Sequence, residues 1–591
     1  MKRIPVLLLL VLAACASPGT QAPQPAGEPG ERTAVFLHVN DVYRIEGVDD
    51  GQVGGLARLR TLRKELEERY PDLLLIHSGD FLFPSFASRL FNGEQMVSVL
   101  NVMDGSPGFD DRMLVVFGNH EFEKAKLKDA ALLDHRVEES QFRWLGGNVV
   151  FKKGEDGRPL VDAPNLARTD VVVSGGIRIG FFGVTIPTAG VAYVDRFDDP
   201  IETARQLTAE LRAQGAEVVV AVTHLPAADD RRLLETLGDD GPDLILGGHD
   251  HERMAVEVGR RGILKADADA RTADVVRLSL GPNGRLSVAH DFRPLERVQV
   301  KPDPDVLELV GDWQAKHEQQ FCTQAGSPPG CLGEVYGLTR TLLEAEENKI
   351  RGSETSLGDW VADQMRLAMK ECGAQVAFVN SGSLRLNQDL SAGTRITRRH
   401  VEELFAYETP LRLIRIDGAT LQKVVDNSVR HWPGSGSWLQ VSGMAYVHDT
   451  AGKAARNLSL LGEGGARAIR PEETILVATN DYLVNPQAGD QDGYIMLDGA
   501  QQKVEGCAAE GRDLKEVVVE ALRAAGTSAF QGQGIEPKAE GRICQPDDKR
   551  PCLAAGAAEG SGGSGPRKLK RTPRTSRTPR TKATEACPWC P

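Results

Sequence analysis

An asparagine and a histidine, Asn119 and His120, directly follow an apolar run of strand length at 113–117 and a single glycine. Such a run is typical of a strand buried on both faces, and α/β proteins place their chemistry at the carboxyl ends of these strands. Asn119 offers an amide oxygen, and the His120 imidazole can bind a metal, donate a hydrogen bond or accept one. Glu123 comes three residues after His120, so it lies on the same face and can orient the imidazole if a helix begins here.

Polar side chains also follow four other apolar runs, at the point where each run ends. The runs cover residues 34–39, 73–76, 218–222 and 244–246, and the side chains that follow them are Asp41, Asp80, His224, His249 and His251. Together with Asn119 and His120 they are carboxylate, amide and imidazole groups without a thiolate, which suits two divalent cations (manganese, zinc, iron or magnesium) bridged by one carboxylate. A single Asp after a strand is usually a helix cap. Four of the twelve histidines of this chain, however, occupy such positions.

The segments around these residues repeat one pattern of apolar strand, polar end and amphipathic helix. Leu56, Leu59, Leu62 and Leu66 mark one face of a helix that follows the first strand. A further apolar run at 177–184 adds another strand after a longer interval. This alternation of strands and helices indicates a layered α/β fold.

Five motifs carry a resemblance to a known family. They are Asn40-Asp41, Gly79-Asp80, Gly118-Asn119-His120-Glu121, Thr223-His224 and Gly248-His249-Asp250-His251. Their order and spacing resemble those of the calcineurin-like dinuclear metallophosphatases, and specifically the bacterial 5′-nucleotidase and UDP-sugar hydrolase family, over roughly residues 33 to 290. The resemblance implies a four-layer α/β/β/α metallophosphatase domain.

The resemblance also implies a role for each residue of the set. Asp80 would bridge the two metals, Asp41 and His251 would complete the shell of one metal, and Asn119, His224 and His249 would complete that of the other. His120 would stabilise the transition state or the leaving group, with Glu123 as its partner.

Two positions depart from the family pattern. Tyr43 stands where the family usually has a histidine, and Glu123 stands where it usually has an aspartate. A phenol is a poor metal ligand unless the metal lowers its pKa, which an Fe(III) site could do; otherwise that metal gains a water, binds more weakly or is a harder ion. Glutamate keeps the charge of aspartate and adds one methylene, so we expect Glu123 to retain the function.

A second apolar pattern covers about 333–544 and follows a stretch of helical periodicity. Within it, Arg351 and Arg385 lie near glycines and strand ends, where a planar guanidinium suits a phosphate or a carboxylate. Tyr407 and Tyr482 lie on expected loops and could sandwich a base, which is worth about 1–3 kcal/mol per base. Taken singly, such arginines are more often solvated, and such tyrosines are more often part of a core or its rim.

These segments resemble the C-terminal substrate-binding domain of the same family, a mixed α/β domain, over roughly residues 334 to 545. The resemblance places Arg351 and Arg385 on the nucleotide, Tyr407 and Tyr482 on its base and Asp492 on a sugar or base, and Asn380 ends a strand beside them. Thr409 replaces a common asparagine and the loop before Asp492 is long, which leaves the base and leaving-group preference open. Family members close by rotating this domain onto the metal site.

The first fifteen residues indicate export. Lys2 and Arg3 give a basic start, and the apolar run at 5–14 is too short to span a bilayer comfortably. The run ends before Cys15 in a pattern that resembles a bacterial lipoprotein signal. We therefore expect Cys15 to carry lipid and to anchor the protein to a membrane, in the periplasm or at the cell surface; the alternative is a plain secretory signal. Residues 16–32, rich in Pro, Gly, Ala and Gln, suit a flexible tether.

The remaining cysteines and the charge add further expectations. Disulfides are permitted after export, and we expect Cys322 to pair with Cys331 across a Gly/Pro-rich loop, with a second pair among Cys507, Cys544 and Cys552. The formal net charge of −13 disfavours a nucleic-acid-binding body.

The chain ends in a basic stretch. Residues 567–582 carry eight basic residues and almost nothing apolar, so we expect the tail at 546–591 to be disordered. Its charge suits anionic polymers such as lipopolysaccharide, nucleic acid or acidic glycans; the alternative is a solvated tail with no dedicated partner.

The sequence thus predicts an exported, lipid-anchored, monomeric metallohydrolase that removes phosphate from nucleoside 5′-monophosphates or related nucleotides. The alternatives are a nucleotide-sugar pyrophosphatase, a 2′,3′-cyclic phosphodiesterase or a sulfur-compound hydrolase on the same scaffold, or a non-catalytic surface binding protein. The near-complete ligand set favours an enzyme. The expected segments are a lipoprotein signal at 1–15, a tether at 16–32, a metallophosphatase domain at 33–299, a connector at 300–333, a 5′-nucleotidase C-terminal substrate-binding domain at 334–545 and the tail at 546–591.

Overall fold

The computed structural model describes residues 30–486, 492–498, 506–526 and 533–554 of the chain. The expected signal with Cys15, the expected tether up to residue 29 and the chain beyond residue 554 lie outside the described residues. Within those ranges, no helix combines the length and the apolar character needed to cross a bilayer.

Two sheets pack face to face in the first domain. One has the strand order β15-β14-β1-β2-β3-β4-β6, and the other has the order β12-β13-β11-β10-β8-β7. The strands of the first sheet are β1 (Arg32–Val39), β2 (Leu74–His77), β3 (Asp110–Val116), β4 (Phe142–Leu145), β6 (Leu166–Ala167), β14 (Thr272–Leu280) and β15 (Leu286–Pro294). Those of the second are β7 (Thr169–Ser174), β8 (Ile177–Thr185), β10 (Val218–His224), β11 (Leu244–Gly247), β12 (Met254–Val258) and β13 (Arg261–Lys265). A short pair, β5 (Val149–Phe151) and β9 (Val194–Phe197), lies outside both sheets.

The strands are apolar on both faces because each sheet is covered on both sides. On β1, Phe36 points into the core between the sheets and meets Phe181 edge to face, with ring centroids 5.8 Å apart. Its neighbour Leu37 belongs to a different core, beneath helices. Successive side chains of a strand point to opposite faces, so a strand enclosed on both faces reads as one continuous apolar run.

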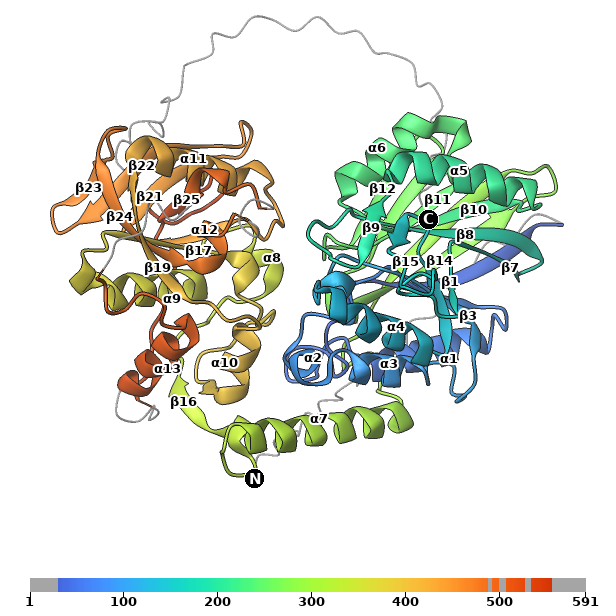
Figure 1. Ribbon diagram of the computed structural model, residues 1–591, viewed down its shortest axis with the longest axis horizontal. Helices are drawn as coiled ribbons and strands as arrows, with labels where there is room; N and C mark the ends of the chain where they lie inside the picture. The colour runs from blue at the N-terminus through green and yellow to red at the C-terminus, as the bar shows by residue number, and fades with distance from the viewer. Residues whose placement is uncertain (1–29, 487–491, 499–505, 527–532, 555–591) are drawn as a thin grey trace, which may run out of the picture.

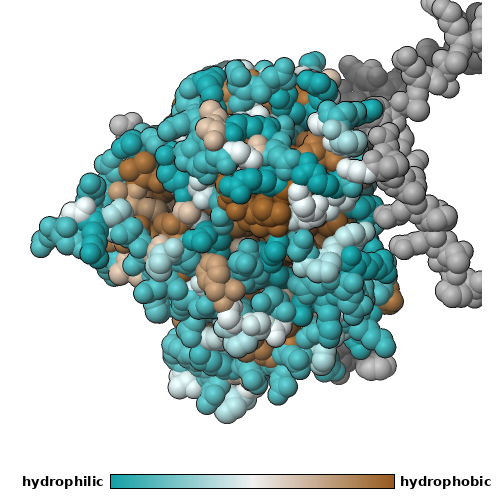
Figure 2. Space-filling view, turned by 90° about the vertical axis from the view of Figure 1, so that its right-hand side faces the viewer, coloured by the Kyte–Doolittle hydropathy of each residue, from teal (hydrophilic) through white to brown (hydrophobic). Residues whose placement is uncertain are grey.

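Helices form the two outer layers. The first sheet is covered by α1 (Leu56–Glu67), α2 (Phe86–Phe91), α3 (Glu94–Leu100) and α4 (Ala130–Glu139), and the second by α5 (Pro200–Ala213) and α6 (Ala227–Leu237). Figure 1 shows α5 and α6 above the sheets and α1 to α4 below them. The prediction of an α/β/β/α architecture is therefore confirmed. Figure 2 views the molecule from the side of the first domain. The surface seen there is mostly hydrophilic, with apolar side chains gathered in separate areas.

One long helix, α7 (Pro304–Gln324), connects the first domain to the second and runs beneath both in Figure 1. It begins at Asp303, whose carboxylate accepts hydrogen bonds from the first-turn N–H groups of Asp305 and Val306, and a proline at the first helical position favours this start. The expected disulfide is present and joins Cys322, in the last turn of this helix, to Cys331 beyond it.

The second domain contains two four-stranded sheets, in the orders β19-β24-β17-β20 and β23-β22-β21-β25. Their strands are β17 (Val376–Asn380), β19 (Leu411–Asp417), β20 (Leu439–Ser442), β21 (Met444–Asp449), β22 (Ala454–Gly462), β23 (Gly465–Ala468), β24 (Thr474–Asn480) and β25 (Ile543–Cys544), and β16 (Val335–Leu338) pairs with β18 (Arg395–Thr397). The helices are α8 (Glu347–Ile350), α9 (Ser356–Ala368), α10 (Arg398–Leu404), α11 (Gly418–Arg430), α12 (Asp481–Val484) and α13 (Leu514–Ala525). This mixed α/β composition confirms the second part of the predicted fold class.

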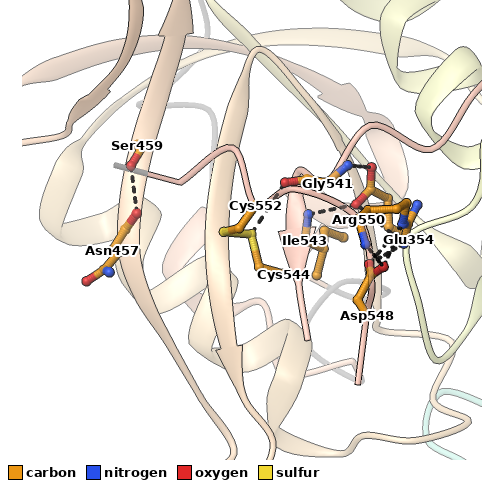
Figure 3. Close-up of a disulfide and its surroundings, with 9 residues drawn as sticks. All are labelled: Glu354, Asn457, Ser459, Gly541, Ile543, Cys544, Asp548, Arg550 and Cys552. Carbon is orange, nitrogen blue, oxygen red and sulfur yellow. Dashed lines mark hydrogen bonds and ion pairs between the residues drawn. A yellow bond between two sulfur atoms is a disulfide. The ribbon is translucent and has the colours of Figure 1, made fainter. Parts of the chain in front are cut away.

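Two further disulfides join Cys372 to Cys507 and Cys544 to Cys552. The second one lies partly within the expected tail, because Cys552 follows residue 546. Figure 3 shows Glu354 beside this disulfide, accepting hydrogen bonds from the backbone of Gly541 (2.9 Å) and Ile543 (3.0 Å). Residues 546–554 belong to the second domain, because the disulfide holds this segment against β21 and β22.

His317 of α7 leads to a prediction about acid stability. It is 3% exposed, and its ring meets that of Phe86 edge on at 4.3 Å. Burial, helped by the positive charges of Arg399 and Arg89, lowers the pKa of His317 to about 4. The unfolded chain, with a His pKa of about 6.5, takes up this proton first, so stability is complete above that pH and is lost as the pH falls toward 4.

We therefore expect His317→Gln to lose less free energy of unfolding than the wild type between pH 7 and pH 4.5, by about 2 kcal/mol. Urea unfolding at the two pH values measures this. His135→Gln on α4 is the matched control, because that side chain is 60% exposed. If His317→Gln loses as much free energy of unfolding as the wild type over this pH range, His317 is not the cause of the acid-dependent loss.

Candidate active site

The expected metal ligands all lie at one edge of the paired sheets. The strands β1, β2 and β3 run parallel to one another, as do β8, β10 and β11, so the loops that follow them meet. Asp41 follows β1, Asp80 follows β2, Asn119 and His120 follow β3, His224 ends β10, and His249 and His251 follow β11. Asp41, Asp80, His249 and His251 have φ values of 54°, 58°, 81° and 60°. Such left-handed conformations cost energy in residues other than glycine and cluster at functional sites.

Asp41, Asp80 and His224 form the tightest cluster, with one ligand atom from each lying within 4.8 Å of the others. Nε2 of His224 lies 3.1 Å from Oδ2 of Asp80 and 3.9 Å from Oδ1 of Asp41. Burial lowers the pKa of His224, but the negative charges of Asp80 and Asp41 outweigh burial and raise it to about 9. Two buried carboxylates and an imidazole are ligand types that fit a divalent cation.

The other expected ligands lie beside this cluster. Nε2 of His251 is 3.2 Å from Oδ1 of Asp41. The backbone N–H of His249 donates to Oδ2 of Asp41 at 2.9 Å, and its Nδ1 lies 3.1 Å from Oδ1 of Asn119. The structure thus brings together all six side chains that the sequence singled out as ligands.

Tyr43 lies within the same cluster. Its hydroxyl oxygen is 3.2 Å from Oδ2 of Asp80, 3.4 Å from Oδ1 of Asp41 and 3.0 Å from Nε2 of His251. Burial, together with the negative charges of Asp80 and Asp41, raises the pKa of the Tyr43 phenol well above its ordinary value. The phenol is therefore a neutral group at a position where an imidazole would be a ligand.

Tyr43 carries a prediction about metal binding. We expect Tyr43→His to reach half-maximal activity at a lower manganese concentration than the wild type, because neutral imidazole is a better ligand than a protonated phenol. Activity at saturating metal should change little. If the phenol ligates as a phenolate, Tyr43→Phe should instead weaken binding clearly. Titrations with manganese, zinc and iron distinguish these cases, and identical curves for all three proteins would contradict both.

His120 and Glu123 adopt the expected arrangement. A short 3₁₀ turn at His120–Phe122 brings Nδ1 of His120 to 3.3 Å from Oε2 of Glu123. The backbone N–H of His120 donates to Oδ1 of Asp80 at 2.8 Å. The imidazole is partly exposed beside the cluster, with its ring centroid 6.1 Å from that of Tyr43.

Glu121 is a positioning residue to which the sequence pattern assigns no role. Its buried carboxylate accepts hydrogen bonds from the backbone N–H groups of Asp80 (2.9 Å), Phe81 (2.8 Å), Leu82 (3.0 Å) and Gly118 (2.6 Å). It therefore joins the loop after β2 to the loop after β3. A Cβ at Gly118 would lie 2.1 Å from Oδ1 of Asp80, which explains the glycine at this position. The only sequence signal for Glu121 was its place in the motif.

Lys265, at the end of β13, is a second such residue. Its buried ammonium group donates to the carbonyl oxygens of Leu225 (2.6 Å) and Gly248 (2.8 Å), and it pairs with Asp230 (2.8 Å) and Asp250 (2.5 Å). It thus holds together the ends of β10 and β11, where the three expected histidine ligands lie. No spacing in the sequence points to it.

The candidate substrate residues of the second domain face this edge of the sheets. The guanidinium of Arg385 lies 5.8 Å from the ring centroid of Tyr407. Burial and the negative charge of Glu123 of the first domain raise the pKa of the Tyr407 phenol well above its ordinary value. Arg351 is buried and paired with Glu347. These contacts bring the candidate phosphate-binding arginines and the His120–Glu123 pair into one space between the domains.

The remaining candidates have different contacts. Tyr482 is 37% exposed, and burial together with the negative charge of Asp492 raises the pKa of its phenol. Asn380 uses its carbonyl oxygen to accept from Ser383 (2.7 Å) and Asn480 (2.9 Å). These hydrogen bonds indicate that Asn380 stabilises the loop that leads to Arg385.

Comparison with known proteins agrees with this arrangement. Residues 34–253 match the family described as calcineurin-like phosphoesterase, and residues 335–499 match the 5′-nucleotidase C-terminal domain. The trifunctional nucleotide phosphoesterase protein YfkN of Bacillus subtilis is 24% identical over an alignment of 552 residues, which covers 86% of this chain and 34% of that protein. This chain therefore spans about a third of that protein. The 5′-nucleotidase of Bos taurus is 23% identical over an alignment of 493 residues, which covers 76% of this chain and 79% of that protein.

Solved structures share the fold. The 5′-nucleotidase precursor of Thermus thermophilus has a TM-score of 0.68 at 21% identity and covers 87% of this chain and 100% of its own. The sulfate thiohydrolase SoxB of Thermus thermophilus has a TM-score of 0.65 at 18% identity and covers 90% of this chain and 99% of its own. With both family domains present in order and the buried carboxylate–histidine cluster at the sheet edge, the chain belongs to the 5′-nucleotidase family and is a metal-dependent phosphoester hydrolase.

Proposed function

We propose that this protein removes the phosphate group from nucleoside 5′-monophosphates or closely related nucleotides, with two divalent cations. One observation carries the proposal: Arg351, Arg385 and Tyr407 of the second domain lie beside the carboxylate–histidine cluster of the first. Arg385 beside Tyr407 supplies a cation for a phosphate and a ring for a base. Glu123, next to His120, is near enough to help raise the pKa of the Tyr407 phenol. A nucleotide combines a phosphate and a base in one molecule.

The donor set divides into two cation sites that share Asp80. Asp41 and His251 would hold one cation, with Tyr43 beside them, and Asn119, His224 and His249 would hold the other. When bound, the cations supply Lewis-acid activation of the phosphoryl group and of the attacking water. Tyr43 bears on the identity of the cations, because it adds a phenol to a set of carboxylate, amide and imidazole groups.

The protein's own residues supply the remaining functions. His120, oriented by Glu123, would donate a hydrogen bond to the phosphoryl oxygens or to the leaving oxygen. Arg351 and Arg385 would bind the phosphate through their planar donors. A base would stack on Tyr407 and Tyr482, and a ribose hydroxyl would hydrogen-bond Asp492. The relatives named as 5′-nucleotidases and as a nucleotide phosphoesterase support this choice of substrate.

A substrate panel tests the proposal. Chelator-treated protein is supplied with manganese, zinc or magnesium and assayed on AMP, UMP, ATP, UDP-glucose, 2′,3′-cyclic AMP and 4-nitrophenyl phosphate. We expect the highest kcat/KM on a nucleoside 5′-monophosphate and no activity without added metal. A higher value on UDP-glucose or on the cyclic nucleotide would replace the proposal with the corresponding alternative activity, and inactivity on every compound with every metal would contradict it.

We further propose that lipid on Cys15 anchors the protein to a membrane after export. Cys15→Ser is expected to move the protein from the membrane fraction to the soluble fraction, because removing the acyl chains removes the anchor. Activity per molecule should not change. If Cys15→Ser still sediments with membranes in high salt, the lipid anchor is not what holds the protein. The basic residues at 567–582 remain a candidate contact for anionic polymers.

A further inference from the structure

One carboxylate of the second domain reaches into the metal cluster of the first. Glu347 begins the short helix α8, which Figure 1 places on the side of the second domain that faces the first. Its Oε2 lies 2.6 Å from Nδ1 of His251, and both side chains are less than a tenth exposed. Its other oxygen pairs with Arg351 and lies 3.9 Å from Nη1 of Arg385. Glu347 therefore touches an expected metal ligand and both candidate phosphate-binding arginines.

The contact defines how His251 can act. A carboxylate only accepts hydrogen bonds, so the imidazole donates from Nδ1 and leaves Nε2 available to a cation. That Nε2 already faces Oδ1 of Asp41 at 3.2 Å. A carboxylate on the far nitrogen of a ligating histidine fixes the orientation of the ring and increases its basicity as a ligand. Glu347 thus completes the surroundings of His251, but only when the two domains are in contact.

A chain of hydrogen bonds anchors Glu347 to the first domain a second time. The backbone N–H of Glu347 donates to Oδ1 of Asn387 at 3.1 Å, and Nδ2 of Asn387 donates to Oδ2 of Asp269 at 2.7 Å. The other oxygen of Asp269 accepts from the backbone N–H of Tyr43 at 3.0 Å. The chain thus returns to the loop that carries Asp41, so the metal cluster is connected to the second domain from two directions.

Two arginines of the first domain make further polar contacts with the second domain. Arg44 donates to the carbonyl oxygens of Arg385 (3.1 Å) and Leu386 (2.7 Å), and Arg89 donates to those of Phe405 (3.1 Å) and Glu402 (2.9 Å). Polar interfaces between domains of one chain commonly open and close. Domain contact is therefore a variable that a ligand can change.

We propose that Glu347 is a positioning residue that makes cation binding and domain docking depend on each other. Docking gives His251 its partner and so strengthens the cation site. By thermodynamic linkage, a bound cation must then favour the docked arrangement by the same factor. The inference rests on the proposed role of His251 as a metal ligand and deepens it, because it adds regulation of the site by the second domain.

The test uses the full chain, stripped of metal, and manganese alone as the probe. Isothermal titration gives the dissociation constant, and small-angle X-ray scattering gives the radius of gyration with and without manganese. We expect Glu347→Gln to weaken binding of the cation held by His251 by about 10- to 100-fold. We also expect it to abolish the compaction that manganese causes in the wild type. Glu347→Asp keeps the charge on a shorter side chain. Its manganese affinity and its compaction should lie between those of the wild type and those of Glu347→Gln.

Glu346→Gln is the matched control. It is the same chemical change one residue earlier, on a side chain that accepts from the backbone of Asn348 at 3.4 Å. It should bind manganese and compact as the wild type does. Melting curves of every variant without metal confirm folding, and the graded Glu347→Asp keeps the inference testable if Glu347→Gln is unstable.

His251→Ala distinguishes failure of the proposed ligand set from failure of the coupling alone. If it binds manganese as tightly as the wild type, His251 is not a ligand, and the ligand set of the proposed function fails together with the inference. If His251→Ala weakens binding while Glu347→Gln does not, only the coupling is overturned. A lower KM with unchanged manganese binding in Glu347→Gln would also overturn it, since Glu347 would then merely compete with substrate for Arg351 and Arg385.

Discussion

Asp80→Asn is expected to reduce kcat/KM by about a thousandfold or more, because one change weakens both cation sites and several kcal/mol of charge stabilisation is lost. The Asp80 carboxylate contacts three other residues of the site. Its Oδ2 lies 3.1 Å from Nε2 of His224 and 3.2 Å from the hydroxyl of Tyr43, and its Oδ1 accepts a hydrogen bond from the backbone N–H of His120. Asparagine keeps the shape but removes the negative charge that a shared cation ligand requires.

The fold should survive this substitution. The side chain of Asp80 lies in a loop after β2, and the backbone N–H of that residue is held by Glu121 whatever side chain it carries. Asp111→Asn, at the opposite end of β3 with its side chain 84% exposed, is the control and should behave as the wild type. Metal content, melting temperature and kcat/KM are measured together. Retention of more than about a tenth of wild-type activity with an intact fold would count against a dinuclear mechanism.

His120→Asn is expected to reduce kcat by about a hundredfold to ten-thousandfold, the range for loss of a positioned proton donor. Manganese binding should stay unchanged, because His120 reaches the cluster through its backbone N–H, which donates to Asp80 and is retained in the variant. The separation of catalysis from metal binding distinguishes this substitution from Asp80→Asn.

The choice of substrate sharpens the test of His120. A nucleoside is a poor leaving group and needs a donor at the departing oxygen, whereas 4-nitrophenolate does not. His120→Asn should therefore lose more activity on AMP than on 4-nitrophenyl phosphate. Glu123→Gln, which retains a hydrogen-bonding group 3.3 Å from the imidazole, should show a smaller loss of the same kind. Equal losses on the two substrates would assign His120 to the phosphoryl oxygens instead of the leaving group.

The fold and most of the site could be predicted from the sequence because both depend on local patterns. Strands enclosed on two faces need uninterrupted apolar residues, so β1, β2, β3, β10 and β11 are visible as runs, and each run has a defined end. Residues such as Asp41, Asp80 and His224 lie at those ends, where parallel pairing brings the loops together. The His120–Glu123 contact spans three residues and was likewise readable from spacing.

The contacts that only the tertiary structure decided are those between distant loops. Glu121 reaches the backbone of Asp80 across 41 residues of sequence, and Glu347 reaches His251 across 96. Cys372 and Cys507 pair across 135 residues, a partnership that no spacing in the chain predicts. A hydrogen bond or a disulfide between loops leaves no periodicity in the sequence, because its partners become neighbours only through sheet order and domain docking. The sequence therefore determined which groups could do the chemistry, and the tertiary structure decided which buried carboxylates hold them in place.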